Sequence, residues 1–365
     1  MHTYLVGGAV RDRLLGRAVR ERDWVITGAT PQQLLALGYR HKDPAFPVFI
    51  HPRTGEEYAL ARRERKRGQG HKAFVLEYGP DVSLNDDLAR RDLTINAMAQ
   101  DEGGELHDPY GGYEDLAQRR LRHVTDAFSE DPLRVLRLAR FAAELDDYGF
   151  DVAPETALLA ARMSGDGGDL LALSPGRIWR ETERALASTA PPRFFRCLRD
   201  FGALPRLMPW LISARDPRAD AAIDALERAV PIDPGIDIRL AALLTGAVHG
   251  GGAAGLPDLA WPLPRGARTL AVLCIDHALP DPDADAVADW LEAMDAWRRG
   301  ERFVQALKVW RAVAPQCAHL DLLQAARDAS AKVPAPAPGS DPGRAVRDAR
   351  RARLREALAR RGDPS

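Results

Sequence analysis

The chain has 365 residues, 45% of them hydrophobic and 28% charged, which is enough for two or three domains with sizeable cores. Its 51 Lys and Arg residues nearly balance its 52 Asp and Glu residues, so net charge alone predicts no nucleic-acid partner. Three widely spaced cysteines without a CxxC pair argue against a disulfide framework and a zinc ribbon. No stretch approaches the roughly 20 apolar residues of a membrane helix, and the first residues do not resemble a signal peptide, so we predict a cytoplasmic protein without a membrane segment.

Residues 1–125 alternate strand-like runs with turn residues. Four runs bounded by Gly, Pro and Asp predict strands: TYLVGG (3–8), DWVITG (23–28), FPVFIHP (46–52) and EEYALARR (56–63). The segments RDRLLG and TPQQLLALG between them predict helices. In the second, we expect Thr30 as N-cap, Pro31 in the first helical position and Gly38 at the end.

From about residue 126 the pattern becomes helix after helix. Ser129 with Pro132, and Ser174 with Pro175, are expected to begin two of these helices. Residues 332–343 read as a stiff Pro-rich linker that leads into a strongly basic terminal helix or disordered tail. We therefore predict an α+β protein, with a mixed α/β head followed by an all-α neck, body and tail, divided into residues 1–125, 126–215, 216–331 and 332–365.

The head carries a combination that suits a metal and a triphosphate. Glycines 7 and 8 allow backbone amides to approach a ligand, and Arg11 opposes the dipole of the following helix unless an anion lies there. Glu21 and Asp23, two apart in a strand, would project carboxylates to one face about 7 Å apart at their Cα atoms. Such a pair can hold two Mg²⁺ ions for phosphoryl transfer, although alone it is more often a solvated strand edge.

Three further charged segments each have a structural and a functional interpretation. Residues 86–99 (DDLARRDLTINAMA) are either a charged helix surface or a place where Arg91 meets phosphate and Asp92 meets sugar hydroxyls. In residues 130–141, helical spacing puts Asp131, Arg134 and Arg137 on one ribbon with Arg140 on its flank. Asp131 and Arg134 would form an intrahelical ion pair or read a nucleobase edge. The basic run 62–74 is a solvated loop or a clamp on a polyanion.

Taken together, these motifs closely resemble the bacterial CCA-adding enzymes, which are class II tRNA nucleotidyltransferases of the polymerase-β-like superfamily. The resemblance extends in order over residues 1 to about 215. It implies that Glu21 and Asp23 bind Mg²⁺ and are catalytic, and that CTP and ATP are the nucleotides. The implied nucleotide-binding residues are Gly8, Arg11, Arg91, Asp92, Asp131, Arg134, Arg137 and Arg140. The 3′ end of tRNA would attack the α-phosphate of CTP twice and of ATP once, releasing pyrophosphate, with Asp131 and Arg134 as a protein template.

Two departures from the family pattern stand out. Position 21 is Glu, where the family usually has Asp. In the body, Thr245-Gly246 stands where related enzymes carry the His-Asp pair of a metal phosphohydrolase, and His249 and His277 are isolated. We therefore expect a degenerate body without phosphatase or phosphodiesterase activity, kept as a tRNA-binding region.

Three other functions remain open at this point. A poly(A) polymerase shares the head and neck, an enzyme adding only CC or only A would have the same motifs, and a non-catalytic RNA-binding protein could retain the fold. The intact charges at positions 21, 23, 91, 131 and 134 argue against the last. The sequence leaves the oligomeric state open.

Overall fold

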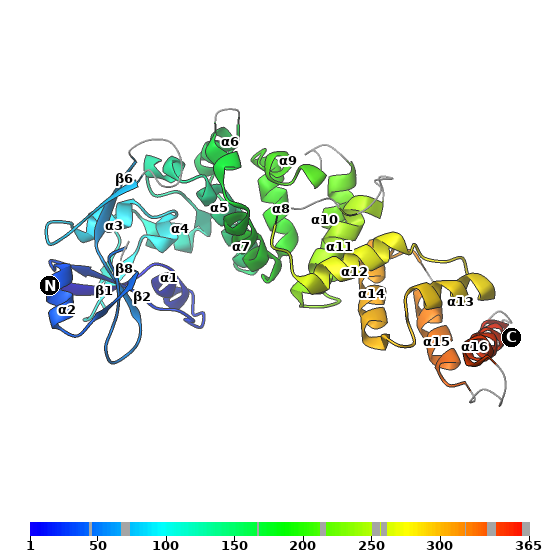
Figure 1. Cartoon of the computed structure of the whole chain (residues 1–365). Helices are drawn as coiled ribbons and strands as arrows, with labels where there is room; N and C mark the ends of the chain where they lie inside the picture. Colours follow the sequence, from blue (N-terminus) through cyan, green and yellow to red (C-terminus); the bar gives the residue numbers. More distant parts are fainter. Residues whose placement is uncertain are drawn as a thin grey trace. The chain divides into compact units, whose positions relative to one another are not determined.

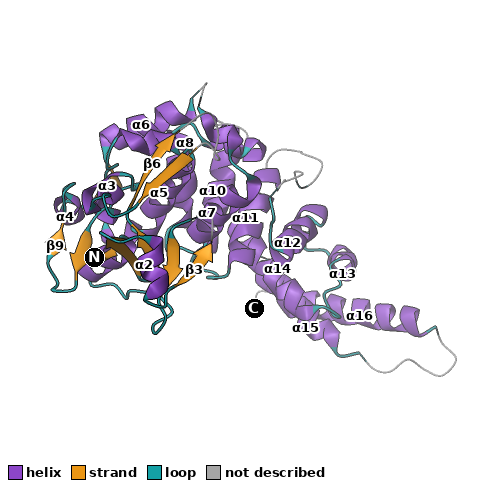
Figure 2. Cartoon of the chain, turned by 60° about the vertical axis from the view of Figure 1, so that its left-hand side comes forward, coloured by secondary structure: helices purple, strands orange, loops and turns teal. Residues whose placement is uncertain are grey.

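The structure is a computed structural model that describes residues 1–43, 46–66, 74–165, 168–211, 217–249, 256, 261–317, 319–333 and 341–359. The chain forms two compact units, one of residues 1–185 with 193–207, and one of residues 186–192 with 208–365. The described strands lie in the first unit, and the second is helical (Figures 1 and 2). The α+β prediction is thus confirmed. The expected head–neck boundary at residue 125 falls inside the first unit.

A mixed seven-stranded sheet forms the base of the first unit. Its strand order is β3-β4-β5-β2-β1-β8-β9, in which only β2 and β5 pair in parallel. The strands are β1 His2–Val6, β2 Asp23–Thr27, β3 Arg40–Asp43, β4 Val48–Ile50, β5 Glu57–Leu60, β8 Ala99–Asp101 and β9 Leu106–His107. Leu5 and Val6 of β1 and Val25 and Ile26 of β2 are buried, and they anchor the strand that carries Asp23.

Helices and two small sheets complete the first unit. The helices are α1 Gly8–Leu14, α2 Pro31–Ala36, α3 Leu84–Ala89, α4 Gly112–Ala117, α5 Leu133–Glu144, α6 Pro154–Ser164, α7 Pro175–Leu186, α8 Pro191–Asp200 and α9 Leu204–Leu207. The short 3₁₀ turns are η1 Thr94–Asn96, η2 Asp126–Glu130, η3 Asp146–Tyr148 and η4 Asp169–Ala172. Strand β6 Arg62–Lys66 pairs antiparallel with β7 Phe74–Tyr78, and β10 Arg120–Leu121 pairs parallel with β11 Asp151–Val152.

Local sequence signals predicted some elements well and misplaced others. Helix α2 has the expected Thr30 cap, as a full capping box with Gln33, and α7 begins at Pro175 as expected. Ser129 does not begin a helix: it lies in η2, and α5 starts at Leu133.

Two charged runs also differ from their simpler interpretations. Residues 86–99 are not one charged helix, because α3 ends at Ala89 and the chain turns before η1. Within the basic run, residues 62–66 form strand β6 rather than a loop, and residues 67–73 lie outside the described residues.

In the second unit, the short 3₁₀ turn η5 Pro209–Leu211 is followed along the chain by seven further helices among the described residues. They are α10 Pro217–Ala229, α11 Ile236–His249, α12 Arg265–Asp276, α13 Ala284–Ala293, α14 Gly300–Val313, α15 Leu320–Ala331 and α16 Pro342–Ala359. The basic terminal segment is therefore helical over residues 342–359, while residues 334–340 of the expected linker lie outside the described part. Among the described residues, none of the helices has the length and apolar character needed to cross a membrane.

Candidate active site

Asp23 opens strand β2 near the centre of the main sheet. It lies opposite Val6 of β1 and Glu57 of β5 in the strand register. Asp23 stays open to solvent on one side, yet the packing around its carboxyl group raises its pKa. The charge of Arg91 opposes that rise, and the carboxylates of Glu21 and Glu57 add to it. Three carboxylates are therefore close enough to influence one another at this end of the strand.

This set of carboxylates fits a divalent metal ion. Asp and Glu oxygens are the ligands that hard cations prefer, and a bound cation would offset the repulsion that raises the Asp23 pKa. Glu21 lies just before β2 rather than inside it, so strand alternation does not align the two side chains as expected. Glu57 was missed at the sequence level, because only the parallel pairing of β5 with β2 brings it opposite Asp23.

The glycine turn after β1 fits closely against an arginine. Gly7 has a φ of +71°, and a Cβ atom there would lie 2.9 Å from Nη1 of Arg91, so the turn requires glycine. Gly8 then begins α1, and Arg11 follows in the middle of this helix. Arg11 is only 6% exposed and donates a hydrogen bond from Nη1 to Oδ1 of Asn96 at 2.7 Å.

Arg91 is oriented by a buried carboxylate that the sequence analysis did not single out. Asp87 is fully buried and accepts hydrogen bonds from Nη2 of Arg91 at 3.1 Å and from Nη2 of Arg90 at 2.7 Å. Burial alone would raise the Asp87 pKa, but these two arginines hold it below its usual value. Arg91 also donates from Nη1 to the carbonyl of Asn96 at 3.4 Å.

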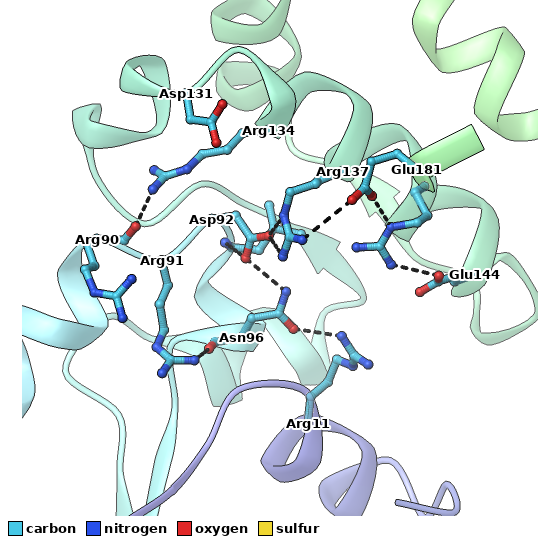
Figure 3. A network of polar contacts seen from close by, with 12 residues as sticks. Arg11, Arg90, Arg91, Asp92, Asn96, Asp131, Arg134, Arg137, Glu144 and Glu181 are labelled. Carbon is cyan, nitrogen blue, oxygen red and sulfur yellow. Dashed lines mark hydrogen bonds and ion pairs between the residues drawn. The ribbon is translucent and has the colours of Figure 1, made fainter. Parts of the chain in front are cut away.

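Asp92 lies at the centre of a buried hydrogen-bond network (Figure 3). Its Oδ2 accepts from Nε of Arg137 at 2.7 Å, and its Oδ1 accepts from Nδ2 of Asn96 at 3.1 Å and from the Leu93 amide at 2.9 Å. Burial opposes ionisation of Asp92, yet Arg137 and Asn96 hold its pKa far below the usual range. Because Asn96 also binds Arg11, one chain of contacts joins Arg11 to Arg137 through Asn96 and Asp92.

Asp131 and Arg134 lie together but are not paired with each other in the way the intrahelical interpretation requires. Asp131 precedes α5, and its Oδ1 accepts from the Leu133 amide at 3.0 Å. Its ion-pair partner is Arg177 of α7, at 2.9 Å. Arg134 donates instead to the main-chain carbonyls of Ala127 and Arg90.

Arg140 is buried more deeply than its expected role suggests. It is 4% exposed, with Nε on Glu181 at 2.5 Å and Nη1 on Glu144 at 2.7 Å. Glu181 also lies 3.9 Å from Arg137, so Arg140 and Arg137 share one carboxylate. Arg140 is therefore connected to Arg137 through the carboxylate of Glu181.

Away from β2, one group of three side chains in the described part of the chain has ligand atoms close enough together to hold a metal ion. Asp101, Glu105 and His107 offer ligand atoms within 4.8 Å of one another on the β8–β9 hairpin. Glu105 is exposed, and Asp101 and His107 are half-buried.

Thr245 and Gly246 lie inside the packing of the second unit. Thr245 is fully buried in α11, and a Cβ atom on Gly246 would come within 2.9 Å of Cβ of Ala225 on α10. Neither side chain can supply the ligands of a His-Asp pair. The absence of phosphohydrolase activity stays a prediction.

Comparisons with known proteins agree with this geometry. Residues 3–122 match the family described as "Poly A polymerase head domain", and residues 149–214 match "Probable RNA and SrmB- binding site of polymerase A". The sheet with its carboxylates and neighbouring arginines thus defines a nucleotidyltransferase head, a class that implies a divalent metal ion.

A curated relative and two solved structures narrow the class. The "Multifunctional CCA protein" of Pseudomonas putida is 48% identical over 315 residues, covering 85% of this chain and 83% of that protein. The Bacillus stearothermophilus CCA-adding enzyme in complex with CTP has a TM-score of 0.64 at 25% identity, covering 98% of this chain and 89% of that one. The Thermotoga maritima CCA-adding enzyme complexed with tRNA shares the fold, with a TM-score of 0.65 at 20% identity over 98% of this chain and 91% of that one. The chain belongs to the bacterial CCA-adding enzymes.

Proposed function

We propose that this protein adds C, C and A to the 3′ end of tRNA from CTP and ATP, releasing pyrophosphate, with Glu21 and Asp23 as the catalytic metal ligands. The observation that carries the proposal is the parallel β2–β5 register, which places Asp23 opposite Glu57 at the end of β2. Burial raises the pKa of Asp23, and the nearby carboxylates of Glu21 and Glu57 add to that rise. This carboxylate group lies beside a guanidinium, that of Arg91, so metal and phosphate sites adjoin. Because tRNA, CTP and ATP meet in the bacterial cytoplasm, we place the reaction there.

We assign Mg²⁺ to the carboxylates of Glu21 and Asp23. When bound, the ion lowers the pKa of the attacking 3′-hydroxyl and neutralises charge on the leaving phosphates. The protein's own contribution is to keep Asp23 fixed in the sheet and to place Glu57 next to it through the β2–β5 register.

Gly8, Arg11 and Arg91 would receive the triphosphate. Gly8 brings the backbone close to the ligand, and the two arginines offer planar donors that match phosphate oxygens. Buried partners, Asp87 for Arg91 and Asn96 for Arg11, fix these guanidinium groups before the nucleotide arrives. Little side-chain entropy is then lost on binding.

Asp92 would contact the sugar of the nucleotide only if a ribose hydroxyl replaced one of its present hydrogen-bond donors. Its Oδ2 accepts from Nε of Arg137 and lies 2.6 Å from Nη2 of the same residue, and its Oδ1 accepts from Asn96 and a backbone amide. Both oxygens therefore already have two donors each. A ribose hydroxyl would have to replace one of these donors. Arg137 lies at the nucleotide as the partner of Asp92, and Arg140 supports it through Glu181.

Asp131 and Arg134 would act as the template. An ionised carboxylate accepts from the exocyclic amino group of C or A and repels the carbonyl of U or G, while a guanidinium donates to ring acceptors. Anchoring of Arg134 on two backbone carbonyls fixes the donor side of this edge.

The test is extension of a tRNA transcript that ends before its CCA, with Mg²⁺ and CTP alone, ATP alone, or both. We expect two C residues from CTP and one further A when ATP is added. Long A tails from ATP alone would identify a poly(A) polymerase, and products that stop at CC with both nucleotides would identify a partial enzyme. No incorporation under any condition would overturn the proposal in favour of an RNA-binding protein.

A further inference from the structure

One face of α7 matches the charged residues of the α5 region. Arg177 and Glu181 are one helical turn apart on α7. Arg177 contacts Asp131 at 2.9 Å, and Glu181 binds Arg140 at 2.5 Å and approaches Arg137 at 3.9 Å. The positive charge of Arg177 therefore lies against Asp131, and the negative charge of Glu181 lies against Arg137 and Arg140. This alternation fixes which part of α7 lies against the α5 region.

Asp131 depends on Arg177 for its orientation. Because Asp131 lies before the first residue of α5, no helical backbone fixes its side chain. The Leu133 amide holds only Oδ1, at 3.0 Å. A single nitrogen of Arg177, Nη2, spans both oxygens, at 3.2 Å from Oδ1 and 2.9 Å from Oδ2. The Arg177 contact is therefore the one that prevents the carboxylate from rotating about its Cβ–Cγ bond.

We propose that Arg177 is a specificity-positioning residue, which holds Asp131 so that its Oδ2 faces the amino group of the incoming base. The inference rests on the proposed function, in which Asp131 and Arg134 read that base. Arg177 acts through Asp131, and its side chain, 16% exposed, need not touch the nucleotide.

The charge chemistry explains why a fixed carboxylate discriminates. Each oxygen of an ionised carboxylate has room for two donors. Oδ2 of Asp131 accepts from Arg177, which leaves one direction for the N4 amino group of C or the N6 amino group of A. The O4 carbonyl of U and the O6 carbonyl of G offer no proton there and are repelled. A carboxylate that is free to rotate would weaken both the attraction and the repulsion.

The experiment measures single-turnover kcat/KM for CTP and UTP on a tRNA that lacks CCA, and for ATP and GTP on the same tRNA ending in CC. We expect Arg177→Ala to lower the CTP/UTP and ATP/GTP ratios by about tenfold or more, since one good base contact discriminates by roughly that factor. Arg177→Lys, which keeps one cationic nitrogen near both oxygens, should restore most of the ratio. Arg180→Ala, an exposed arginine on the same helix, is the matched control and should leave the ratio unchanged.

Thermal melting of each variant reports whether it is folded, and Arg177→Gln is the second variant if Arg177→Ala does not fold. Equal losses with all four nucleotides and an unchanged ratio would mean a merely structural role and would overturn the inference. Asp131→Ala separates the two proposals. If Asp131→Ala loses discrimination while Arg177→Ala and Arg177→Gln keep it, only the inference about Arg177 fails. If Asp131→Ala also keeps it, the proposed base reading fails and the inference with it.

Discussion

Asp23 has opposite effects on folding and on catalysis. Its pKa is raised above the ordinary value of 3.8 by packing and by neighbouring carboxylates, so the fold favours the protonated form. Metal binding needs the ionised form. With a raised folded-state pKa, the stability that protonated Asp23 contributes is present at low pH and is lost as pH rises through that pKa. At neutral pH the metal-free protein therefore holds an unfavourable charge.

We predict that Asp23→Asn raises the melting temperature of the metal-free protein at pH 7 and lowers kcat for CTP addition by about 100-fold or more. The stability gain comes from removal of the crowded charge, and the loss of rate reflects several kcal/mol of metal-derived stabilisation. Calorimetry and nucleotide incorporation measure the two effects. Added Mg²⁺ should stabilise the wild type and not the variant. A variant that melts at a lower temperature would contradict the argument.

The pKa of Asp92 is shifted in the opposite direction to that of Asp23. Arg137 and Asn96 lower its pKa despite burial, so its stabilising effect is present above pH 3.8 and is lost as pH falls below that value. We predict that Asp92→Asn lowers the free energy of unfolding at pH 7 by about 3 kcal/mol, because the half-buried Arg137 loses its main counter-charge, the carboxylate of the buried Asp92. Urea unfolding at pH 7 and pH 3.5 tests this, and the gap to wild type should narrow at pH 3.5. Asp289→Asn, which breaks an exposed pair with Arg351, should change the free energy by less than about 1 kcal/mol.

Candidate site residues could be proposed from the sequence where the signal was local, and not where it depended on a long-range contact. The residue types at positions 21, 23, 91, 92 and 131 follow from motifs that each occupy a few consecutive positions. Arg177 lies 46 residues from Asp131, and no spacing rule connects them. Asn96 was not singled out from the sequence, because its hydrogen bonds with Arg11 and Asp92 depend on the turn between α3 and η1.

At the scale of elements, α11 packs on α10 through a glycine. A Cβ atom at Gly246 would meet Cβ of Ala225 at 2.9 Å and Cα of Ala222 at 3.1 Å, which is closer than real side chains approach. We predict that Gly246→Ala destabilises the protein by about 1–3 kcal/mol, because overpacking moves the helices apart. Denaturant unfolding measures the change.

A matched glycine provides the control for that prediction. Gly176 lies in the first turn of α7, and a Cβ atom there would meet nothing within 4 Å. Gly176→Ala should therefore be neutral or stabilising by up to about 1 kcal/mol, from helix propensity alone. Equal destabilisation by both substitutions would show that packing at Gly246 is not the cause.

Elements with clear start residues in the sequence were predicted more accurately than elements that form through pairing with a distant segment. The Thr30-Pro31 start of α2 is a local signal, and the structure follows it. Strand β6 has a charged, unpatterned sequence and forms because β7 pairs with it across the segment 67–73. Helix α5 begins at Leu133 and not at the expected Ser129. The Thr125 side chain accepts a hydrogen bond from the Ala127 amide and begins η2, which contains Ser129.

At the scale of the whole molecule, charge is distributed unevenly although the total is near zero. Helix α16 is attached to its unit by one face, where Leu354 is fully buried and Arg350 lies 4.2 Å from the Trp297 ring. Four other arginines of α16 are exposed: Arg344, Arg347, Arg353 and Arg355. Arg355 pairs with Asp285, and Arg344 lies 3.8 Å from Asp348. Exposed arginines suit the phosphate groups of an RNA backbone.

We predict that the triple substitution of Arg344, Arg347 and Arg353 by Gln raises KM for tRNA and leaves KM for CTP unchanged. If each arginine contacts one phosphate, the slope of log affinity against log salt should fall by about 2–3. Steady-state kinetics at several salt concentrations would show this. An unchanged tRNA KM and salt slope would mean that α16 contacts no RNA.

Gly246, where α11 packs against α10, also limits which substitutions this protein can accept. A His-Asp pair at positions 245 and 246 would need space for two metal-ligating side chains, and here Thr245 is fully buried and Ala225 fills the space beside Gly246. Reinstating the pair would require more than two codon changes, since the helices must first separate. A side chain larger than glycine at position 246 would therefore lower stability before it could supply a metal ligand.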